Sequence, residues 1–349
     1  MSRPLPRPGL RDVEPYAAPQ LDVRARLNTN ECPYPLPERF RESLASAVSE
    51  IALNRYPDRE AIELRTRLAA LNDHVLEGTW VANGSNEIVL QLLQAYAGPQ
   101  RRVVLFEPTY ALHSRLSWVT RSEIAPIAIG EPWIVTDDDV EAAIASDPDV
   151  IFFCSPNNPT GNTQPLDVME RATNGSALVV VDEAYVEFGG ESAARLIARH
   201  PNVVVVRTFS KAFALAGARL GYCLSSPEVV QDLRRVRLPY HVSTLTQAAG
   251  LVALDHREDA LAILDAIRKE RDRILDALPP MGVEAFPSDA NFVLFRPSKP
   301  AREVWQALLD RGVLVRDFTT VIPEALRVTA GTPDEVDLFL SALEEVLHG

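Results

Sequence analysis

Short apolar runs of strand length recur along the first two thirds of the chain, separated by segments whose apolar residues follow a helical spacing. The helical segments include 58–71, where isoleucine and leucine recur at near-helical intervals, and 87–96. The strand-like runs are continuously apolar, which is typical of strands buried on both faces of a parallel sheet. They lie at 103–106, 124–129, 150–154, 177–181, 203–207 and 220–224. This alternation predicts an α/β domain whose largely parallel sheet lies between helices.

The pattern changes after about residue 245. A long helical stretch at 246–278, with a charged break near 255–259, leads into shorter elements. The last helix has a clear start signal, because Thr332 can cap it, Pro333 suits its first turn and Glu335 completes a capping box. Before it we expect a helix at 301–311 and strands at 283–286, 292–295, 313–316 and 326–329. These elements predict a second, smaller α+β domain.

The N-terminal segment is rich in proline. Eight of the 27 prolines fall within the first 40 residues, and proline disfavours the interior of a helix. We therefore expect an extended arm that packs near the smaller domain. The predicted division is an arm at 1–37, a large domain at 38–245 and a small domain at 246–349.

Composition narrows the classes of partner. The formal net charge is −13, whereas non-specific nucleic-acid binding requires a basic face, so we expect no nucleic-acid partner. No stretch approaches the ~20 apolar residues of a membrane span, and no N-terminal apolar region resembles a signal peptide. The three cysteines and six histidines show neither disulfide nor metal-ligand spacing. We therefore expect a cytoplasmic protein with no membrane partner and no metal.

Lysine is scarce, which narrows the search for an amine nucleophile to three residues. Lys269 lies in the charged segment R-K-E-R-D-R and Lys299 in a proline-flanked loop, whereas Lys211 directly follows a predicted strand among small and apolar residues. An apolar pocket lowers the pKa of a lysine and makes its amine nucleophilic. The alternative is a surface lysine whose stem lies on apolar side chains. Ser210 and Arg219 favour the first interpretation, because they can hold a phosphate near the amine.

Two other predicted strand ends carry polar side chains. Asp182 follows the apolar run V-V-V, where an ionised carboxylate is costly unless it is paired. It is a helix cap, a salt-bridge partner, or the partner of a protonated ring nitrogen, with Tyr185 in reach of a ring oxygen. The segment S-P-N-N-P-T-G at 155–161 is explained by a tight turn alone. Because ligands bind beyond the carboxyl ends of parallel strands, Asn157 is also placed to hydrogen-bond a ring hydroxyl.

Two further segments are compatible with ligand binding. In A-N-G-S-N-E at 82–87, Gly84 allows close approach of the backbone, and the amides of Ser85 and Asn86 open a helix. Such a helix start can bind an anion, although many Gly-Ser turns only cap helices. Tyr110 follows the strand at 103–106 and either stacks on a planar ring or packs in the core.

Arg316 and Arg327 lie at or in short predicted strands of the second domain. Arginine binds carboxylate or phosphate through two parallel hydrogen bonds. With the groups above, these residues suit a ligand that has a phosphate, a pyridine nitrogen, a phenolic oxygen and an aldehyde that reacts with an amine. That ligand is pyridoxal phosphate.

Several motifs occur in one order along nearly the whole chain. They are L-N-T-N-E-C-P-Y (27–34), R-Y-P-D (55–58), N-G-S-N-E (83–87), P-N-N-P-T-G (156–161), V-D-E-A-Y (181–185), S-K-A-F-A-L-A-G-A-R-L-G-Y (210–222) and L-R-V-T-A-G-T (326–332). This set resembles the fold-type I pyridoxal-phosphate aminotransferases and, more narrowly, the histidinol-phosphate aminotransferase family. The segment R-L-P-Y-H-V-S-T-L-T-Q-A-A (237–249) is similar to the actinobacterial members.

The resemblance implies a large domain with a mostly parallel, mixed sheet between helices, plus a smaller α+β domain. It implies that Lys211 binds the cofactor and then moves the substrate proton, that Asp182 pairs with the ring nitrogen, and that Tyr110 stacks on the ring. The other implied cofactor-binding residues are Tyr56, Gly84, Ser85, Asn86, Asn157, Tyr185, Ser210 and Arg219. The implied substrate-binding residues are Tyr16, Asn30, Asn157, Arg316 and Arg327. Tyr56 would reach the active site of the partner subunit in a homodimer.

The implied reaction transfers an amino group between glutamate and imidazole acetol phosphate, giving histidinol phosphate and 2-oxoglutarate. A transaminase of the same fold that acts on aromatic amino acids, chiefly phenylalanine, would share nearly all the motifs. Two further alternatives are a decarboxylase of an amino-acid phosphate and a non-catalytic binding module. The joint presence of Lys211, Asp182 and Asn157 argues against the non-catalytic module.

Overall fold

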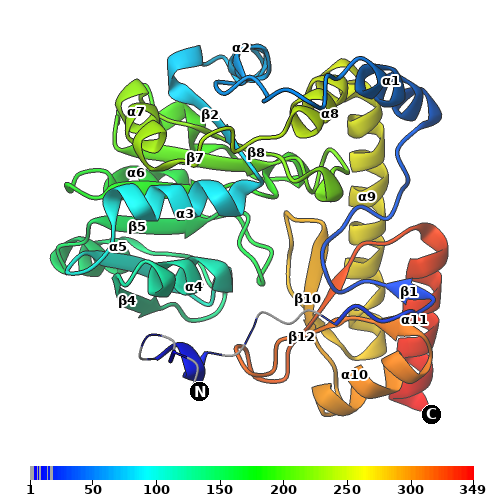
Figure 1. Ribbon diagram of the computed structural model, residues 1–349. Coiled ribbons are helices and arrows are strands. Elements are labelled where there is room, and N and C mark those ends of the chain that lie inside the picture. Colours follow the sequence, from blue (N-terminus) through cyan, green and yellow to red (C-terminus); the bar gives the residue numbers. More distant parts are fainter. Residues whose placement is uncertain (1–3, 6, 8, 14, 16–18) are drawn as a thin grey trace.

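The computed structural model describes residues 4, 5, 7, 9–13, 15 and 19–349 (Figure 1). A seven-stranded sheet forms the centre of the large domain. Its strands, in spatial order, are β2 (Thr79–Ala82), β8 (Gly221–Leu224), β7 (Val203–Thr208), β6 (Leu178–Asp182), β5 (Val150–Cys154), β3 (Arg102–Glu107) and β4 (Glu123–Ala128). All neighbouring pairs from β7 to β4 are parallel, and β8 is antiparallel to both β7 and β2. The mostly parallel mixed sheet is therefore confirmed.

Both faces of this sheet are buried from β2 to β3, as the continuous apolar runs predict, whereas the edge strand β4 has no buried residue. Along β5, Ile151 and Phe153 belong to one hydrophobic core while Val150 and Phe152 belong to another. The second core includes residues of α3 (Ser85–Tyr96) and α7 (Pro227–Val236), and the first includes residues of α5 (Asp137–Ala145) and α6 (Leu166–Ala172). The two helical layers enclose the sheet and leave the strand ends as the place where a ligand can enter.

The helices of the large domain begin close to their predicted positions, with one shift. The helix predicted at 58–71 begins at Ile62 as α2 (Ile62–Leu71). The carboxylate of Asp58 accepts hydrogen bonds from the amides of Glu60 (2.9 Å) and Ile62 (2.8 Å), so the aspartate closes the turn before the helix. The helix α4 (Ala111–Val119) follows Tyr110 directly. The remaining helix of this region is α1 (Glu38–Ser49).

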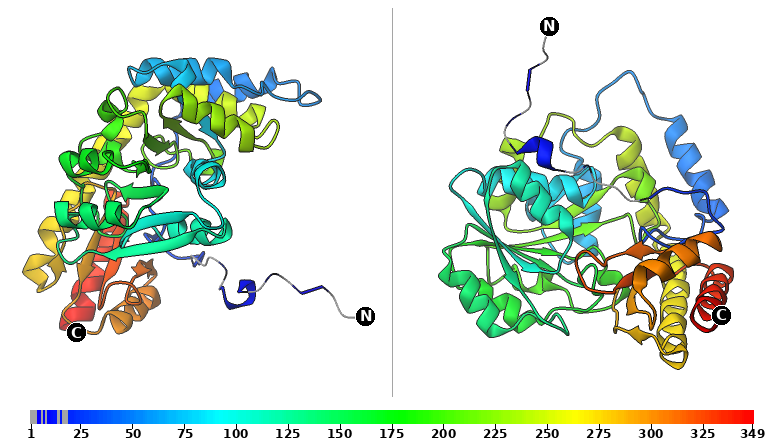
Figure 2. Two further views of the ribbon diagram at one scale, coloured as in Figure 1. Left: turned by 90° about the vertical axis from the view of Figure 1, so that its left-hand side faces the viewer. Right: turned by 90° about the horizontal axis from the view of Figure 1, so that it is seen from below.

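The smaller domain contains a four-stranded antiparallel sheet. Its strands, in spatial order, are β12 (Arg316–Asp317), β13 (Leu326–Thr329), β10 (Phe292–Arg296) and β9 (Glu284–Ala285). Beside this sheet are α10 (Ala301–Asp310) and α11 (Pro333–His348), and α11 packs against both α10 and the long helix α9 (Arg257–Ala277) (Figure 2). The predicted break in the long helical stretch separates α8 (Thr244–Asp255) from α9 at His256. The capping box of Thr332 and Glu335 is present.

The predicted strand at 313–316 is two strands rather than one. β11 (Val313–Leu314) pairs in parallel with β1 (Ala25–Arg26), whereas β12 pairs with β13 in a different sheet. The division occurs because residues 25–27 of the N-terminal segment lie along this edge: the amide of Leu27 donates to the carbonyl of Leu314 (2.8 Å). The side chains of Ala25 and Leu27 belong to the hydrophobic core of the smaller domain. The domain boundaries at 37 and 245 remain predictions.

The longest helix of the described residues, α9, spans 21 residues and carries charges along its length. Within the part of the chain that the structure describes, no helix combines the length and the apolar character needed to cross a bilayer.

Candidate active site

A cavity of about 990 Å³ lies at the carboxyl ends of the parallel strands, between the two domains. Residues of the N-terminal segment, the large domain and the small domain all line it. The structure brings together most of the residues predicted for the site. The predicted residues that line the cavity are Asn30, Ser85, Asn86, Tyr110, Asp182, Tyr185, Ser210, Lys211, Arg219, Arg316 and Arg327.

Lys211 lies in the loop after β7, with its amine inside the cavity. Its Nζ donates to the carbonyl oxygens of Asn30 (2.7 Å) and Thr29 (3.2 Å) and lies 5.8 Å from the ring centroid of Tyr185. Burial, together with the nearby charge of Arg327, lowers the pKa of Lys211 to about 8. A substantial fraction of the amine is therefore neutral near pH 8 and can act as a nucleophile.

Asp182 ends β6 and is 2% exposed. One carboxylate oxygen accepts from the amide of Ala184 (3.1 Å), and the other lies 3.0 Å from Nε2 of His113. The imidazole is wholly buried, stacks on Phe152 at 4.7 Å and meets the ring of Tyr110 edge-on at 5.4 Å. His113 therefore fixes the orientation of the Asp182 carboxylate towards the cavity.

Sequence reasoning missed His113, although it lies on α4 one helical turn after Tyr110. A single histidine in a helix with ordinary neighbours gives no sign of a partner 69 positions away. The detectable signal was its position three residues after a predicted ring-stacking tyrosine, since that spacing places both side chains on one helix face.

The cavity contains a cradle suited to an anion. Ser85 and Asn86 begin α3, and Ser210 accepts hydrogen bonds from Thr208 (2.9 Å) and Arg219 (3.5 Å). Gly84 does not line the cavity but shapes it: at φ 81°, a β-carbon there would lie 2.7 Å from the Arg219 guanidinium. The backbone amides of a helix start and a nearby guanidinium together bind phosphate.

Asn157 lies beside the cavity but is not part of its lining. Its amide donates to the carbonyl of Pro108 (2.9 Å) and to Thr160 (2.7 Å), and its side-chain oxygen accepts from Thr109 (3.0 Å). These contacts hold the side chain between its own turn and the segment that follows β3. The next residue, Asn158, lines the cavity and accepts a hydrogen bond from Arg327. Two adjacent asparagines in one turn are indistinguishable by sequence pattern, so contact of Asn157 with the ring hydroxyl stays a prediction, and Asn158 is a second candidate.

Arg327 is 5% exposed, and its guanidinium lies between the rings of Phe292 (4.8 Å) and Phe318 (5.0 Å). It also donates to the carbonyl of Asn28 (3.0 Å). Arg316 is directly opposite Arg327 across the β12–β13 pair, so both side chains project from the same face of the small sheet. Two guanidinium groups therefore meet at one wall of the cavity.

Asn30 connects this wall to the predicted ring-binding side. Its amide donates to the Tyr185 hydroxyl (3.0 Å), and its side-chain oxygen accepts from Thr329 (3.0 Å). A further predicted residue, Tyr56, does not line the cavity. Tyr56 is 79% exposed and stacks on Tyr240 with 4.3 Å between centroids, and Tyr16 lies outside the described residues.

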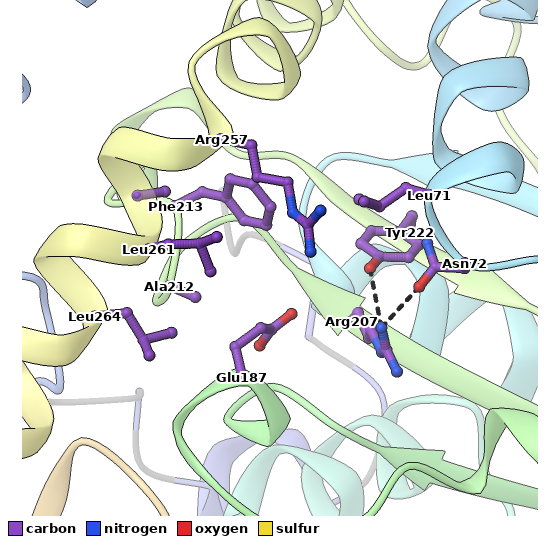
Figure 3. A pocket seen from close by; sticks show the side chains of 11 residues that line it. Leu71, Asn72, Glu187, Arg207, Ala212, Phe213, Tyr222, Arg257, Leu261 and Leu264 are labelled. Carbon is purple, nitrogen blue, oxygen red and sulfur yellow. Dashed lines mark hydrogen bonds between the residues drawn. The ribbon is translucent and has the colours of Figure 1, made fainter.

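A second, smaller pocket of about 120 Å³ lies behind the loop that follows Lys211. Figure 3 shows Glu187 and Arg257 pointing into it from opposite sides, with Phe213 between apolar neighbours. One oxygen of the Glu187 carboxylate is buried without a hydrogen-bond partner among the described residues. Burial raises the pKa of Glu187 to about 7, although Arg207 acts in the opposite direction.

Comparison with known proteins identifies the family. The family model described as aminotransferase class I and II matches residues 25–343. The chain belongs to this family and is a pyridoxal-phosphate-dependent aminotransferase.

More particular similarity comes from individual relatives. A curated histidinol-phosphate aminotransferase from Frankia casuarinae is 47% identical over 361 residues, covering 98% of this chain and 90% of the relative. One of the same name from Thermobifida fusca is 47% identical, covering 97% and 94%. These sources agree with the actinobacterial resemblance in the sequence.

Solved structures agree with the fold. A crystal structure from Erwinia carotovora atroseptica has a TM-score of 0.87 and 26% identity, covering 95% of this chain and 98% of that one. The histidinol-phosphate aminotransferase from Sinorhizobium meliloti in complex with pyridoxal-5'-phosphate has a TM-score of 0.84 and 24% identity, covering 93% and 91%. The fold is therefore the fold type I expected from the sequence.

The described residues fit pyridoxal phosphate. Lys211 supplies an amine with a lowered pKa, and Asp182 supplies a carboxylate fixed by His113. The cradle of Ser85, Ser210 and Arg219 has space because Gly84 lacks a β-carbon. These features match an aldehyde, a ring nitrogen and a phosphate respectively.

Proposed function

We propose that the protein transfers an amino group between glutamate and imidazole acetol phosphate, producing histidinol phosphate and 2-oxoglutarate. The observation that carries this proposal is that Arg316 and Arg327 lie on one wall of the cavity that also contains Lys211. Arg316 and Arg327 are opposite each other on one sheet face, which suits substrates that carry a carboxylate or a phosphate. The names of the relatives from Frankia casuarinae and Thermobifida fusca support the same substrate pair.

The bound cofactor supplies an electron sink for the carbanion formed at the substrate α-carbon. This chain's residues perform the other tasks. Asp182 would accept the ring N–H and keep that nitrogen protonated, with His113 holding its carboxylate in place at 3.0 Å. Lys211 would take the α-proton, because its lowered pKa allows it to act as a base near neutral pH.

The remaining residues position the ligands. We propose that Ser85, Asn86, Ser210 and Arg219 hold the phosphate of the cofactor, and that Asn158 and Tyr185 face its ring oxygen. Tyr110 lies at the start of α4 and would cover one ring face. Asn30, Arg316 and Arg327 would bind the substrate, since all three line the cavity on the side of the N-terminal segment and small domain.

We also propose a homodimer in which Tyr56 reaches the partner's cofactor phosphate. Large apolar side chains near Tyr56 are exposed and suit burial against a second copy. Leu53 is 73% exposed, Leu238 71% and Leu245 45%. A cytoplasmic location is proposed as well, supported by three free cysteines and no disulfide among the described residues.

The test is a comparison of specificity constants for purified holoenzyme. We expect kcat/KM for histidinol phosphate to exceed that for phenylalanine by at least a hundredfold. A ratio near or below one would assign the enzyme to aromatic substrates, and carbon dioxide release without keto-acid formation would assign it to decarboxylation. Sedimentation of the native protein and of Leu238→Asp tests the dimer, which the aspartate is expected to dissociate.

A further inference from the structure

A third arginine projects from the sheet face that carries Arg316 and Arg327. In the β10–β13 pair, Leu294 is directly opposite Arg327, and Arg296 is two residues further along β10. Residues two apart on a strand share a face, so Arg296 is a diagonal neighbour of Arg327. Such neighbours are about 7–8 Å apart. Arg296 also lines the same cavity.

Arg296 is held in place by the small domain itself. Its Nε donates to the carbonyl of Pro323 (3.1 Å), and Nη1 donates to Glu284 (3.1 Å). The guanidinium lies 5.1 Å from the ring of Phe286 and 6.0 Å from that of Trp133. Glu284, Pro323 and Phe286 of the small domain hold the guanidinium from one side, and Trp133 of the large domain also contacts it.

The outer edge of the guanidinium binds a carboxylate from the large domain. Both oxygens of Glu131 accept hydrogen bonds from Arg296, with 3.2 Å between Nη1 and Oε2 and a second bond from Nη2 to Oε1. Glu131 lies in the segment after β4, lines the cavity and has a side chain that is 45% exposed. Arg296 is its only side-chain hydrogen-bond partner among the described residues.

We propose that Arg296 is a terminal-anion subsite, that Glu131 occupies it when no substrate is bound, and that the terminal carboxylate or phosphate of a substrate replaces Glu131. This inference rests on the proposed function, because it needs substrates with an anionic group beyond the reacting carbon. Glutamate has its side-chain carboxylate there, and histidinol phosphate has its phosphate, which is its only anionic group. A substrate carboxylate presents the same two oxygens to the guanidinium as Glu131 does. For glutamate, Arg327 at the diagonal position would hold the other carboxylate.

Replacement of Glu131 is inexpensive. An ion pair with a half-exposed member contributes little, because water solvates the released carboxylate. Arg296 loses no support, since Glu284 and Pro323 still hold it. Once Glu131 leaves, the two N–H groups that it accepted from would face the cavity and could donate to both oxygens of a substrate anion.

The two partners are therefore expected to have opposite effects on substrate binding. In Glu131→Gln, the competing charge is gone, and KM for glutamate falls by up to about fivefold. In Arg296→Gln, a charged hydrogen-bond donor is lost, and KM for glutamate rises by about tenfold or more. Phenylalanine has no terminal anion, so neither variant changes its KM more than about twofold. The matched control is Glu284→Gln, which removes a partner of Arg296 outside the cavity and should not lower KM.

Histidinol phosphate distinguishes the source of the anion. If the two variants change KM in opposite directions for glutamate alone, Arg296 is a carboxylate subsite. If they do so for histidinol phosphate alone, it is a phosphate subsite. Opposite changes of KM for both substrates identify a subsite that the two anions share. Shifts of the two variants in the same direction, or equal shifts for phenylalanine, overturn the inference and identify a clamp between domains. Melting temperatures of the holoenzyme variants verify folding.

Failure of this inference and failure of the proposed function give different results. If the wild-type enzyme does not use histidinol phosphate, the proposed function is wrong, while the glutamate measurements still report on Arg296. If it uses histidinol phosphate and no KM responds to either variant, the subsite is refuted and the proposed function stands.

Discussion

The titration of Glu187 should make the stability of this protein depend on pH in an unusual direction. Its carboxylate lines the small pocket behind the Lys211 loop, and one oxygen has no hydrogen-bond partner among the described residues (Figure 3). Burial raises its pKa from 4.5 to about 7. The perturbation to test is Glu187→Gln, which keeps the shape of the protonated carboxyl group and removes its titration.

The size of the effect follows from the pKa. Glu187 binds its proton more tightly in the folded protein than in the unfolded chain, so between pH 4.5 and 7 the folded state holds more protons and loses stability as pH rises. One pKa unit corresponds to about 1.36 kcal/mol, so the full penalty above pH 7 is at most about 3 to 4 kcal/mol. Glutamine avoids this penalty. The variant should therefore match the wild type at pH 4.5 and exceed its stability at pH 8.

The assay is urea unfolding of the holoenzyme and the variant in parallel from pH 4.5 to 8.5. Subtracting the free energy of unfolding of the wild type from that of the variant at each pH removes the contribution of all groups that the two proteins share. We expect this difference to rise with pH and to level off above pH 7. The matched control is Glu191→Gln, a 58% exposed carboxylate in a surface ion pair with Arg195, which should change stability by less than about 0.5 kcal/mol. A pH-independent difference for Glu187→Gln would refute the reasoning.

Three further predictions concern the active site and the core. Lys211→Ala should lower the rate of single-turnover amino transfer by at least about a hundredfold, because the variant lacks the amine that moves the proton; stopped-flow absorbance measures it, and near-normal turnover would exclude Lys211 as the base. His113→Phe should lower kcat with little change in KM and alter the pH dependence of cofactor absorbance, because Asp182 loses its side-chain partner; a change in KM alone would contradict the positioning role. Arg65→Met should destabilise the protein by about 1–3 kcal/mol, because the wholly buried guanidinium donates to the carbonyls of Thr79 (2.7 Å) and Leu76 (2.9 Å); an unchanged urea midpoint would show that these carbonyls find other donors.

Local signals in the sequence predicted most of the fold. Continuous apolar runs correctly indicated the strands from β3 to β8, although the edge strand β4 is not buried, and the capping signal at Thr332 located the start of α11. The four-residue strand β2 was not predicted, because a short apolar segment between turns has no periodicity of its own. The strand predicted at 313–316 was wrong as a single element, since its two halves pair with partners nearly 300 and about ten positions away.

The site shows the same division between local and distant information. Lys211 and Asp182 were predictable because each follows a strand, and parallel strands end at one edge. His113 and the Glu131–Arg296 pair were not predictable, because their roles depend on partners 69 and 165 positions apart. The sequence could not distinguish Asn157 from Asn158, because only the folded turn determines which of the two side chains lines the cavity.

The absorption spectrum of purified holoenzyme during substrate addition tests the central claim most directly. The account predicts an absorption band from cofactor bound to Lys211, and loss of that band at low concentrations of histidinol phosphate as the cofactor is aminated. Glutamate should produce the same change, whereas phenylalanine should require far higher concentrations. An absorption band that responds equally well to phenylalanine would contradict the proposed substrate, and the absence of any band after cofactor addition would contradict the assignment of the cavity as the active site.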